Sequence, residues 1–335
     1  MDEQKKRRDF LKATAGVSLA LGTQVGAQSP TKESDKFGDI LPRRPLGKTG
    51  LNPTVYCVGG AHISRKEPKE AQAVIDRAIE RGVRFFDTAV AYKNGKSEEY
   101  YGQFLTPKYR EHIHLFSKTQ AKTAKQAREH VEGSLRRMKT DYLDLYLVHS
   151  VESIDDVNRR WAGGAWDELL KLKAEGKIKH LGFSGHRNYE AHLHLLRKDE
   201  QQLEFCLMPF NVADPSYRSF ITNTVPLLKE RKMGLLGMKT LAGSGFFGVH
   251  PFKDNSVVES SIIPAKISVA EALSFALTGP VTAIVNGVDD VKQLDENIDT
   301  VLNHKQLTEA ERQALVDRCA EEGKTGTMEY FKEKV

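Results

Sequence analysis

The segment EPKEAQAVIDRAIERGVRFFDT (residues 67–88) contains one helix and one strand in a pattern that the rest of the chain repeats. Its first part, Glu67–Arg81, has apolar residues three and four positions apart, which predicts an amphipathic helix that stops at Gly82. Its last part, Arg84–Thr88, is a short run with two phenylalanines, which predicts a buried strand. A helix followed directly by such a strand predicts an α/β protein.

Seven further short apolar runs bring the number of predicted strands to eight, with helical stretches such as Ala124–Met138 and Trp166–Glu175 between them. Strands that alternate with helices pair in parallel, because each crossover returns the chain to the same sheet edge. Eight units favour a closed (β/α)8 TIM barrel over a doubly wound open sheet, and no G-x-G-x-x-G follows the first strand. The predicted strands are Thr54–Gly59, Arg84–Thr88, His114–Lys118, Leu143–His149, His180–Ser184, Phe205–Phe210, Gly234–Lys239 and Thr282–Asn286.

The chain divides into three predicted parts. Residues 1–27 are expected to form a signal peptide, residues 28–41 a polar linker and residues 42–335 the barrel domain. Within the barrel domain, Pro42–Pro53 contains a glycine-bearing turn, and we expect it to form an N-terminal β-hairpin that closes the barrel floor.

The predicted signal peptide resembles a twin-arginine export signal. Arg7 and Arg8 precede the apolar run Ala13–Leu21 and the small residues Val25-Gly26-Ala27. We therefore expect an exported, periplasmic protein that uses the twin-arginine export machinery; a basic amphipathic helix is the alternative. No stable membrane anchor is expected, because this run is shorter than the roughly 20 apolar residues that span a bilayer.

Composition excludes two classes of site. The net charge of +5 is mild for 335 residues, so a nucleic-acid partner is not expected. The three cysteines, Cys57, Cys206 and Cys319, form no C-x-x-C pair, so a metal centre built on thiolates is not expected. Cys57 and Cys206 lie in apolar runs and are predicted to be buried.

Polar residues end several predicted strands, where barrel enzymes carry their active sites. Asp87, Lys118 and His149 end three strands, and Tyr92 follows Asp87 in its loop. An ammonium beside a phenol lowers the phenol pKa, an aspartate keeps the ammonium charged, and a histidine can bind or relay protons to the substrate oxygen. A cofactor must supply any hydride, because no side chain does. Taken singly, each residue has a structural alternative: a capping aspartate, a rim lysine, a loop tyrosine or a core histidine.

A glycine-rich loop, KTLAGSG (239–245), follows the seventh predicted strand. Backbone amides around Leu241 and Gly243, with Lys239 as the counter-charge, are suited to a pyrophosphate. A flexible rim loop is the alternative.

Several segments together resemble aldo-keto reductases, and the resemblance runs from about residue 43 to 300. It implies that Tyr92 is the general acid/base, that Lys118 and Asp87 tune it, and that His149 orients the carbonyl. It also implies that Ser184 binds the nicotinamide carboxamide, while Gln293, Glu296 and Asn297 lie at the adenine end. The resembling segments are RRPLGKTGLNPTVYCVGG (43–60), RFFDTAVAYKNGKSEEYYGQFL (84–105), FSKT (116–119), SLRRMKTDYLDLYLVHS (134–150), KIKHLGFSGH (177–186) and NGVDDVKQLDEN (286–297).

The sequence departs from the family pattern around the cofactor. Gly185 stands where the family usually has asparagine, Leu207 where it has glutamine, and Met238 where an aromatic residue often stacks on the nicotinamide. Gly287, Val288 and Gln293 replace the residues that hold a 2′-phosphate, and Asp289 and Asp290 add negative charge. We therefore expect an NAD(P) cofactor with weak or no preference for NADP.

The expected function is an NAD(P)-dependent oxidoreductase that interconverts a carbonyl and an alcohol. Export argues for a tightly bound cofactor, and a sugar-like substrate is one hypothesis, with Trp161 and Trp166 either stacking on the sugar or packing in the fold. Two alternatives remain: a cofactor-retaining sugar epimerase or isomerase, and a non-catalytic nucleotide-binding regulatory barrel.

Overall fold

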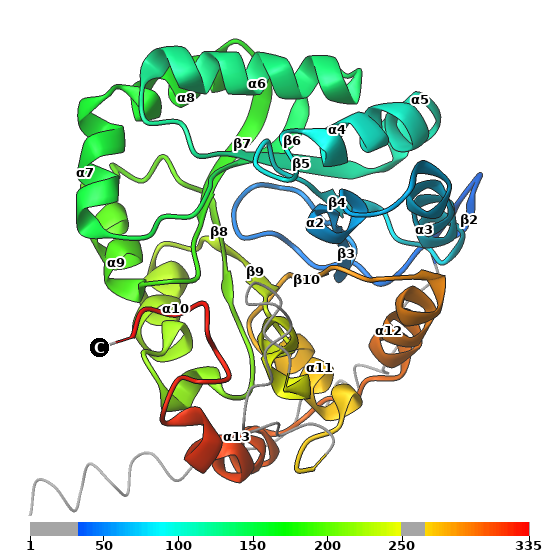
Figure 1. Cartoon of the computed structure of the whole chain (residues 1–335), viewed down its shortest axis with the longest axis vertical. Helices are drawn as coiled ribbons and strands as arrows, with labels where there is room; N and C mark the ends of the chain where they lie inside the picture. Colours follow the sequence, from blue (N-terminus) through cyan, green and yellow to red (C-terminus); the bar gives the residue numbers. More distant parts are fainter. Residues whose placement is uncertain (1–32, 249–264, 335) are drawn as a thin grey trace, which may run out of the picture. The chain divides into compact units, whose positions relative to one another are not determined.

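Eight parallel strands form a closed barrel in the computed structural model, which describes residues 33–248 and 265–334 (Figure 1). The strand order around the barrel is β10-β3-β4-β5-β6-β7-β8-β9. Every predicted strand overlaps an observed one, so the (β/α)8 barrel is confirmed and the open sheet is excluded. The strands are β3 (Tyr56–Gly59), β4 (Phe85–Asp87), β5 (His114–Thr119), β6 (Leu143–Val148), β7 (Ile178–Ser184), β8 (Phe205–Pro209), β9 (Gly234–Met238) and β10 (Ala283–Asn286).

Helices surround the strands (Figure 1). The helix predicted over Glu67–Arg81 is α3 (Pro68–Glu80), and Glu67 and Glu70 close its first turn with a capping box. The other α-helices are α2 (Gly60–Ile63), α4 (Lys96–Tyr100), α5 (Thr106–Tyr109), α6 (Ala124–Met138), α7 (Ile154–Ala162), α8 (Ala165–Ala174), α9 (Tyr189–Lys198), α10 (Phe220–Glu230), α11 (Val269–Thr278), α12 (Val291–Asn303) and α13 (Glu309–Gly323). Shorter turns are the π-helix η1 (Tyr101–Leu105) and the 3-10 helices η2 (Arg110–His112), η3 (Asp214–Ser216) and η4 (Ala242–Phe247).

The barrel interior is filled by side chains from alternate strand positions. This inner cluster includes Phe85, Phe116, Leu145 and Leu236, all fully buried. Neighbouring strand residues such as Phe86 point the other way and pack under the helices. Cys57 and Cys206 are both buried, as predicted.

The predicted N-terminal hairpin is present at the barrel floor. Antiparallel backbone hydrogen bonds join Val55 N to Pro42 O at 2.8 Å and Leu46 N to Leu51 O at 2.9 Å. The Leu46 side chain is fully buried within the inner cluster. This leucine closes the barrel at the amino ends of the strands.

A second hairpin, β1 (Ser34–Asp35) with β2 (Gly38–Asp39), lies in the segment that was expected to be a linker. The fully buried Arg84 guanidinium donates to both carboxylate oxygens of Asp35 at 2.8 Å. Residues from Glu33 onward form one compact unit with the barrel, so the folded part begins before position 42. The expected signal peptide lies outside the described residues.

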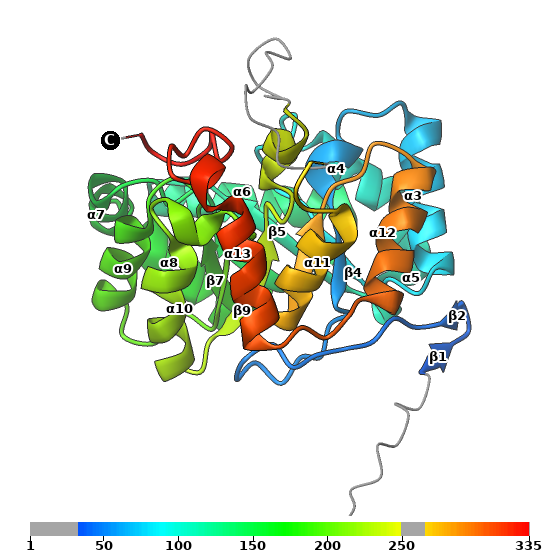
Figure 2. The same ribbon diagram turned by 90° about the horizontal axis from the view of Figure 1, so that it is seen from below.

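Figure 2 shows β1 and β2 at the lower edge and the C-terminal segment at the upper edge.

Within residues 33–248 and 265–334, no helix combines the length and apolar character needed to cross a membrane. The same residues contain no group of three or more His, Cys, Asp or Glu side chains that could hold a metal ion.

Candidate active site

Four predicted catalytic residues lie where the carboxyl ends of β4, β5 and β6 meet. Asp87 is the last residue of β4, Lys118 is the next to last of β5, and His149 follows β6 directly. Tyr92 belongs to the loop that leaves β4. Because these strands are neighbours in the barrel, their ends bring the four side chains into one place.

The Lys118 ammonium connects the other groups. Its side chain is only 1% exposed, which excludes a rim lysine. Its Nζ is ion-paired with Asp87 Oδ1, donates to the Thr88 carbonyl at 2.8 Å and lies 3.1 Å from the Tyr92 hydroxyl. An ammonium has three donors and no acceptor. The Tyr92 oxygen therefore accepts the third hydrogen bond, and its own proton stays available for donation elsewhere.

Tyr92 and His149 form the more accessible half of the group. Both are half-buried, whereas Asp87 and Lys118 are buried. Their ring centroids lie 5.8 Å apart at an interplanar angle of 88°. His149 Nδ1 is buried and has no hydrogen-bond partner in the part of the chain that the structure describes.

The pKa of Tyr92 differs from the sequence expectation. Burial raises the pKa of Tyr92 above its ordinary value of 10.0, and the Asp87 carboxylate raises it further against the Lys118 ammonium. We expected a lowered value. The ion pair with Asp87 offsets much of the Lys118 charge, so burial decides the direction. Tyr92 is therefore a neutral phenol at neutral pH.

The other groups have charge states that suit this phenol. Burial lowers the pKa of Lys118, but the Asp87 carboxylate and Tyr92 outweigh it, so the net shift is upward and the ammonium persists. Burial raises the pKa of Asp87 against the attraction of Lys118. Burial, followed by the charge of Lys118, holds the pKa of His149 well below its ordinary range. His149 is therefore a neutral imidazole that can donate one hydrogen bond.

Three predicted cofactor residues end β7 and β9. Ser184 is 1% exposed, and its Oγ has no hydrogen-bond partner among the described residues, which fits an amide group that arrives with a ligand. Gly185 has no room for a side chain, because a Cβ there would lie 2.5 Å from His192 Nε2 and 2.6 Å from Val151 O. Met238 packs against the inner cluster at the end of β9.

The glycine-rich loop begins at Lys239, directly after β9. Burial lowers the pKa of Lys239 to about 8, and the charge of Arg65 adds to the effect. No carboxylate among the described residues forms an ion pair with Lys239. Leu241 precedes η4, and the Tyr330 hydroxyl donates to the Gly243 carbonyl at 2.9 Å. The loop is therefore tied to the C-terminal segment and presents a cation without a fixed counter-charge.

The expected adenine-end residues lie separately, after β10 and on α12. Gly287 packs against the His62 ring, and Gln293 Oε1 accepts from the Asp289 N–H at 2.9 Å. Asn297 Nδ2 lies 3.3 Å from Tyr56 Oη, while Glu296 is exposed. Within the described ranges, no hydrogen bond or ion pair joins Gly287, Gln293, Glu296 or Asn297 to the four catalytic candidates.

Sequence reasoning missed the contribution of two regions to this end of the barrel. Lys66 donates to the Asp289 carbonyl, and His62 Nδ1 lies 2.9 Å from Asp289 Oδ1, which ties the loop after β3 to the loop after β10. The Phe331 ring lies 5.6 Å from the His186 ring. The adjacent aromatic residues Tyr330 and Phe331, after the last helix, were the only available signal for a returning C-terminal segment.

The two tryptophans pack in the fold. Trp161 on α7 and Trp166 on α8 stack on each other with ring centroids 5.1 Å apart, and Trp166 is buried. They therefore give no support to the sugar-stacking hypothesis.

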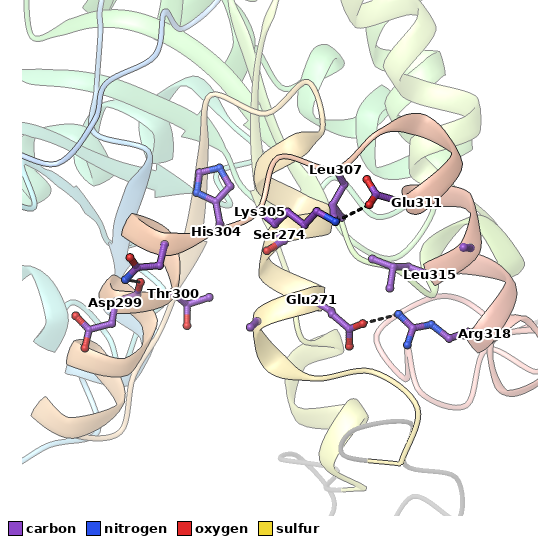
Figure 3. Close-up of a pocket in the computed structure, with 13 residues that line it drawn as sticks. Glu271, Ser274, Asp299, Thr300, His304, Lys305, Leu307, Glu311, Leu315 and Arg318 are labelled. Atoms are coloured by element: carbon purple, nitrogen blue, oxygen red, sulfur yellow. Dashed lines mark hydrogen bonds and ion pairs between the residues drawn. The ribbon is translucent and has the colours of Figure 1, made fainter. Parts of the chain in front are cut away.

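A groove of about 650 Å³ lies away from these residues, between α11, α12 and α13 (Figure 3). Two ion pairs line it, Arg318 with Glu271 at 2.6 Å and Lys305 with Glu311 at 2.5 Å. It contains none of the catalytic candidates, so the active site is assigned to the strand ends instead.

Comparison with known proteins agrees with this fold. The sequence model of the Aldo/keto reductase family matches residues 56–320. An uncharacterized oxidoreductase of Bacillus subtilis (strain 168) is 26% identical over 308 residues, which cover 82% of this chain and 95% of the relative. A methylglyoxal reductase of Escherichia coli (strain K12) is 35% identical over 172 residues, 50% of this chain and 53% of the relative. The holo form of an aldo-keto reductase from Bacillus halodurans has the same fold, with a TM-score of 0.68 at 22% identity, over 83% of this chain and 96% of that one.

Proposed function

This chain belongs to the aldo/keto reductase family, and on that basis we propose that Tyr92 is the general acid and base of its reaction. The protein is an NAD(P)-dependent oxidoreductase that interconverts carbonyl compounds and alcohols. The proposal adds which residue moves the proton, which residues hold the cofactor and what kind of carbonyl compound is reduced.

One observation carries the assignment of Tyr92. Its oxygen lies 3.1 Å from Lys118 Nζ, and the other two donors of that ammonium are used by Asp87 and Thr88. In the reducing direction, the Tyr92 O–H bond breaks and its proton goes to the carbonyl oxygen of the substrate. The phenolate that remains is stabilised by the Lys118 ammonium already in contact with it.

His149 has a complementary role in this proposal. As a neutral imidazole beside the Tyr92 ring, it donates a hydrogen bond to the same carbonyl oxygen and so orients it. The raised pKa of Tyr92 keeps its proton in place at neutral pH, which favours reduction over oxidation under those conditions.

The residues at the strand ends suit a nicotinamide cofactor, which supplies the hydride when bound. We assign Ser184, with Gly185 and Met238 beside it, to the nicotinamide end. Lys239, Leu241 and Gly243 are assigned to the pyrophosphate. Gly287, Gln293, Glu296 and Asn297 are assigned to the adenine end.

The assigned adenine end favours NAD over NADP. Asp289 and Asp290 flank this end and repel a 2′-phosphate. Dissociation constants of NADH and NADPH, measured on the same preparation, test this preference. Tighter binding of NADPH would contradict it.

We propose a small hydroxylated carbonyl compound, such as a short sugar, as the substrate. Neutral His149 and His186 both lie near the assigned site, and burial holds the pKa of His186 at about 4. Neutral imidazoles suit hydroxyl and carbonyl groups better than they suit anions. The Escherichia coli relative is named for methylglyoxal, which is also a small carbonyl compound.

The test is to incubate the purified protein with reduced cofactor and a panel of methylglyoxal and short aldoses, and to quantify cofactor and products. The expected result is one alcohol formed for each reduced cofactor consumed. An isomerised sugar without net cofactor consumption would instead identify an epimerase or isomerase. Bound nucleotide with no turnover of any substrate would identify a regulatory barrel.

We also propose that residues 1–27 direct export through the twin-arginine machinery and that the exported protein keeps its cofactor. The paired Arg7 and Arg8 support this assignment. Replacement of both arginines by lysine is expected to retain the protein in the cytoplasmic fraction. Nucleotide released from the denatured periplasmic protein supports retention of the cofactor, and nucleotide-free periplasmic protein contradicts it.

A further inference from the structure

We propose that Glu98 is a positioning residue that holds residues 88–98, here called the Tyr92 segment, against β5, the strand that carries Lys118. The inference rests on the proposed role of Tyr92. Glu98 lies on α4, and within the described residues no hydrogen bond or ion pair joins it to Asp87, Tyr92, Lys118 or His149.

Glu98 is a fully buried carboxylate with an unusually complete set of partners. Its Oε1 accepts from the Ser117 hydroxyl at 2.5 Å and from the Ser134 hydroxyl at 2.7 Å. Its Oε2 accepts from Arg137 Nε at 2.6 Å. A buried charge is expensive unless it is paired and hydrogen-bonded, so these contacts hold α4 at one place.

Ser117 gives this carboxylate a direct connection to the active site, because it immediately precedes Lys118 on β5. Successive strand residues point to opposite faces, so Ser117 faces the helices while Lys118 faces the barrel mouth. The Glu98–Ser117 hydrogen bond therefore joins the helix after Tyr92 to the strand residue beside Lys118.

The backbone between Tyr92 and α4 needs such support. Lys93, Asn94 and Gly95 all have positive φ angles, of 47°, 55° and 89°. Left-handed conformations cost energy for residues with a side chain and persist where surrounding contacts fix them. The Arg137 guanidinium, held by Glu98, packs against Gly95, where a Cβ would lie 2.6 Å from Arg137 Nε. The turn is therefore clamped by the partner of Glu98.

The beginning of the same segment is also attached. Thr88 Oγ1 lies 2.8 Å from Ser97 Oγ, and the Thr88 carbonyl accepts from Lys118. Both ends of the Tyr92 segment are thus fixed relative to β5, and the Tyr92–Lys118 distance follows from these attachments. A shift of about 1 Å at a reacting group can cost up to roughly a hundredfold in rate, so loss of one attachment is measurable.

Ser117 and Ser134 offer a matched pair of variants for the test. Both are fully buried serines that donate to the same oxygen of Glu98, but Ser134 lies on α6, which carries none of the four catalytic candidates. We would measure kcat, KM and the thermal unfolding midpoint of Ser117→Ala and Ser134→Ala, with methylglyoxal and a short aldose as probes. We expect kcat to fall roughly tenfold for Ser117→Ala and less than about twofold for Ser134→Ala, at similar KM and similar loss of stability. Equal kcat values for the two variants would overturn the inference.

Variants of Glu98 itself give a second, independent readout. Glu98→Gln keeps an oxygen acceptor for both serines, whereas Glu98→Ala removes it, so we expect the glutamine to restore most of the kcat lost in the alanine variant. If Glu98→Ala does not fold, the comparison of Ser117→Ala with Ser134→Ala decides the inference by itself. Tyr92→Phe separates the two proposals. Full turnover by Tyr92→Phe would refute the role of Tyr92, whereas an inactive Tyr92→Phe with equal serine variants would refute only the role of Glu98.

Discussion

Two buried lysines, Lys118 and Lys332, have similar polar partners but differ in the group that accepts their third hydrogen bond. Both are almost completely buried, and each contacts a carboxylate and a backbone carbonyl. The third donor of Lys118 goes to the half-buried Tyr92 hydroxyl. Lys332 instead pairs with two carboxylates, Asp214 at 2.8 Å and Glu329 at 2.6 Å, and donates to the Tyr217 carbonyl at 2.7 Å.

The two ammonium groups differ in their third partner, and this difference separates a structural contact from a contact with a proton donor. The partners of Lys332 are two buried carboxylates and the Tyr217 carbonyl, and Asp214 also accepts from the Phe220 N–H at 3.1 Å at the start of α10. This cluster attaches the C-terminal segment at the upper edge of Figure 2 to the loop before α10. Around Lys118 one partner carries a proton that it can release. We therefore expect a buried ammonium to assist proton transfer where, like Lys118, it contacts a hydroxyl, and to stabilise the fold where, like Lys332, it contacts only carboxylates and a carbonyl.

The largest effect is expected for Lys118→Met, which removes the group proposed to stabilise the Tyr92 phenolate. We predict that kcat falls by about 10³-fold, within the range of general acid catalysis. Steady-state kinetics with reduced cofactor and methylglyoxal measure it. Because Asp87 would be left as an uncompensated buried charge, the double variant Asp87→Asn/Lys118→Met serves as the folding control. A kcat within tenfold of wild type in both Lys118→Met and the double variant would contradict the proposed role of Lys118.

A third lysine extends the comparison to a cation that has no carboxylate partner in the described residues. The pKa of Lys239 is lowered to about 8, so its charge is present below that pH and is lost as the pH rises through it. If Lys239 holds the cofactor phosphates, we predict that the cofactor Kd rises up to about tenfold between pH 7 and pH 9. Fluorescence titration at each pH measures this. The cofactor Kd of Lys239→Met should already be raised at pH 7 and should not change between pH 7 and pH 9.

The smallest effect on turnover is expected for Lys332→Met. Removal of one partner from a buried ionic cluster costs about 3 kcal/mol, so the thermal unfolding midpoint should fall by roughly 5–10 °C while kcat stays within about threefold. Lys324 is the control, because its pair with Glu321 is largely exposed and contributes little. A large loss of kcat without loss of stability in Lys332→Met would contradict a purely structural role of Lys332.

Local periodicity predicted the barrel because each strand and helix of this fold is a short, regular unit. Eight runs such as Arg84–Thr88 and Leu143–His149 sufficed to give the strand number, and parallel pairing followed from the alternation with helices. The catalytic candidates followed in turn, since Asp87, Lys118 and His149 are polar residues that end apolar strands. Their contact with one another needed only the rule that strand ends meet at one edge.

Features that depend on distant contacts were not predictable in this way. The β1–β2 hairpin lies in a polar segment, and its attachment depends on the buried Arg84 that binds Asp35 from a position 49 residues away. The direction of the Tyr92 pKa shift depends on how burial and the Asp87–Lys118 ion pair offset each other, which a sequence does not give. The return of Tyr330 and Phe331 to the barrel mouth is fixed by Lys332 and its buried partners.

Single-turnover kinetics of Tyr92→Phe test the central claim most directly. The variant, loaded with reduced cofactor, would be mixed rapidly with a small aldehyde, and oxidation of the cofactor would be followed beside an equilibrium measurement of cofactor Kd. We predict that the hydride-transfer rate falls by about 10³-fold while the cofactor Kd changes less than about twofold. A transfer rate within about threefold of wild type would contradict the assignment of Tyr92 as the proton donor.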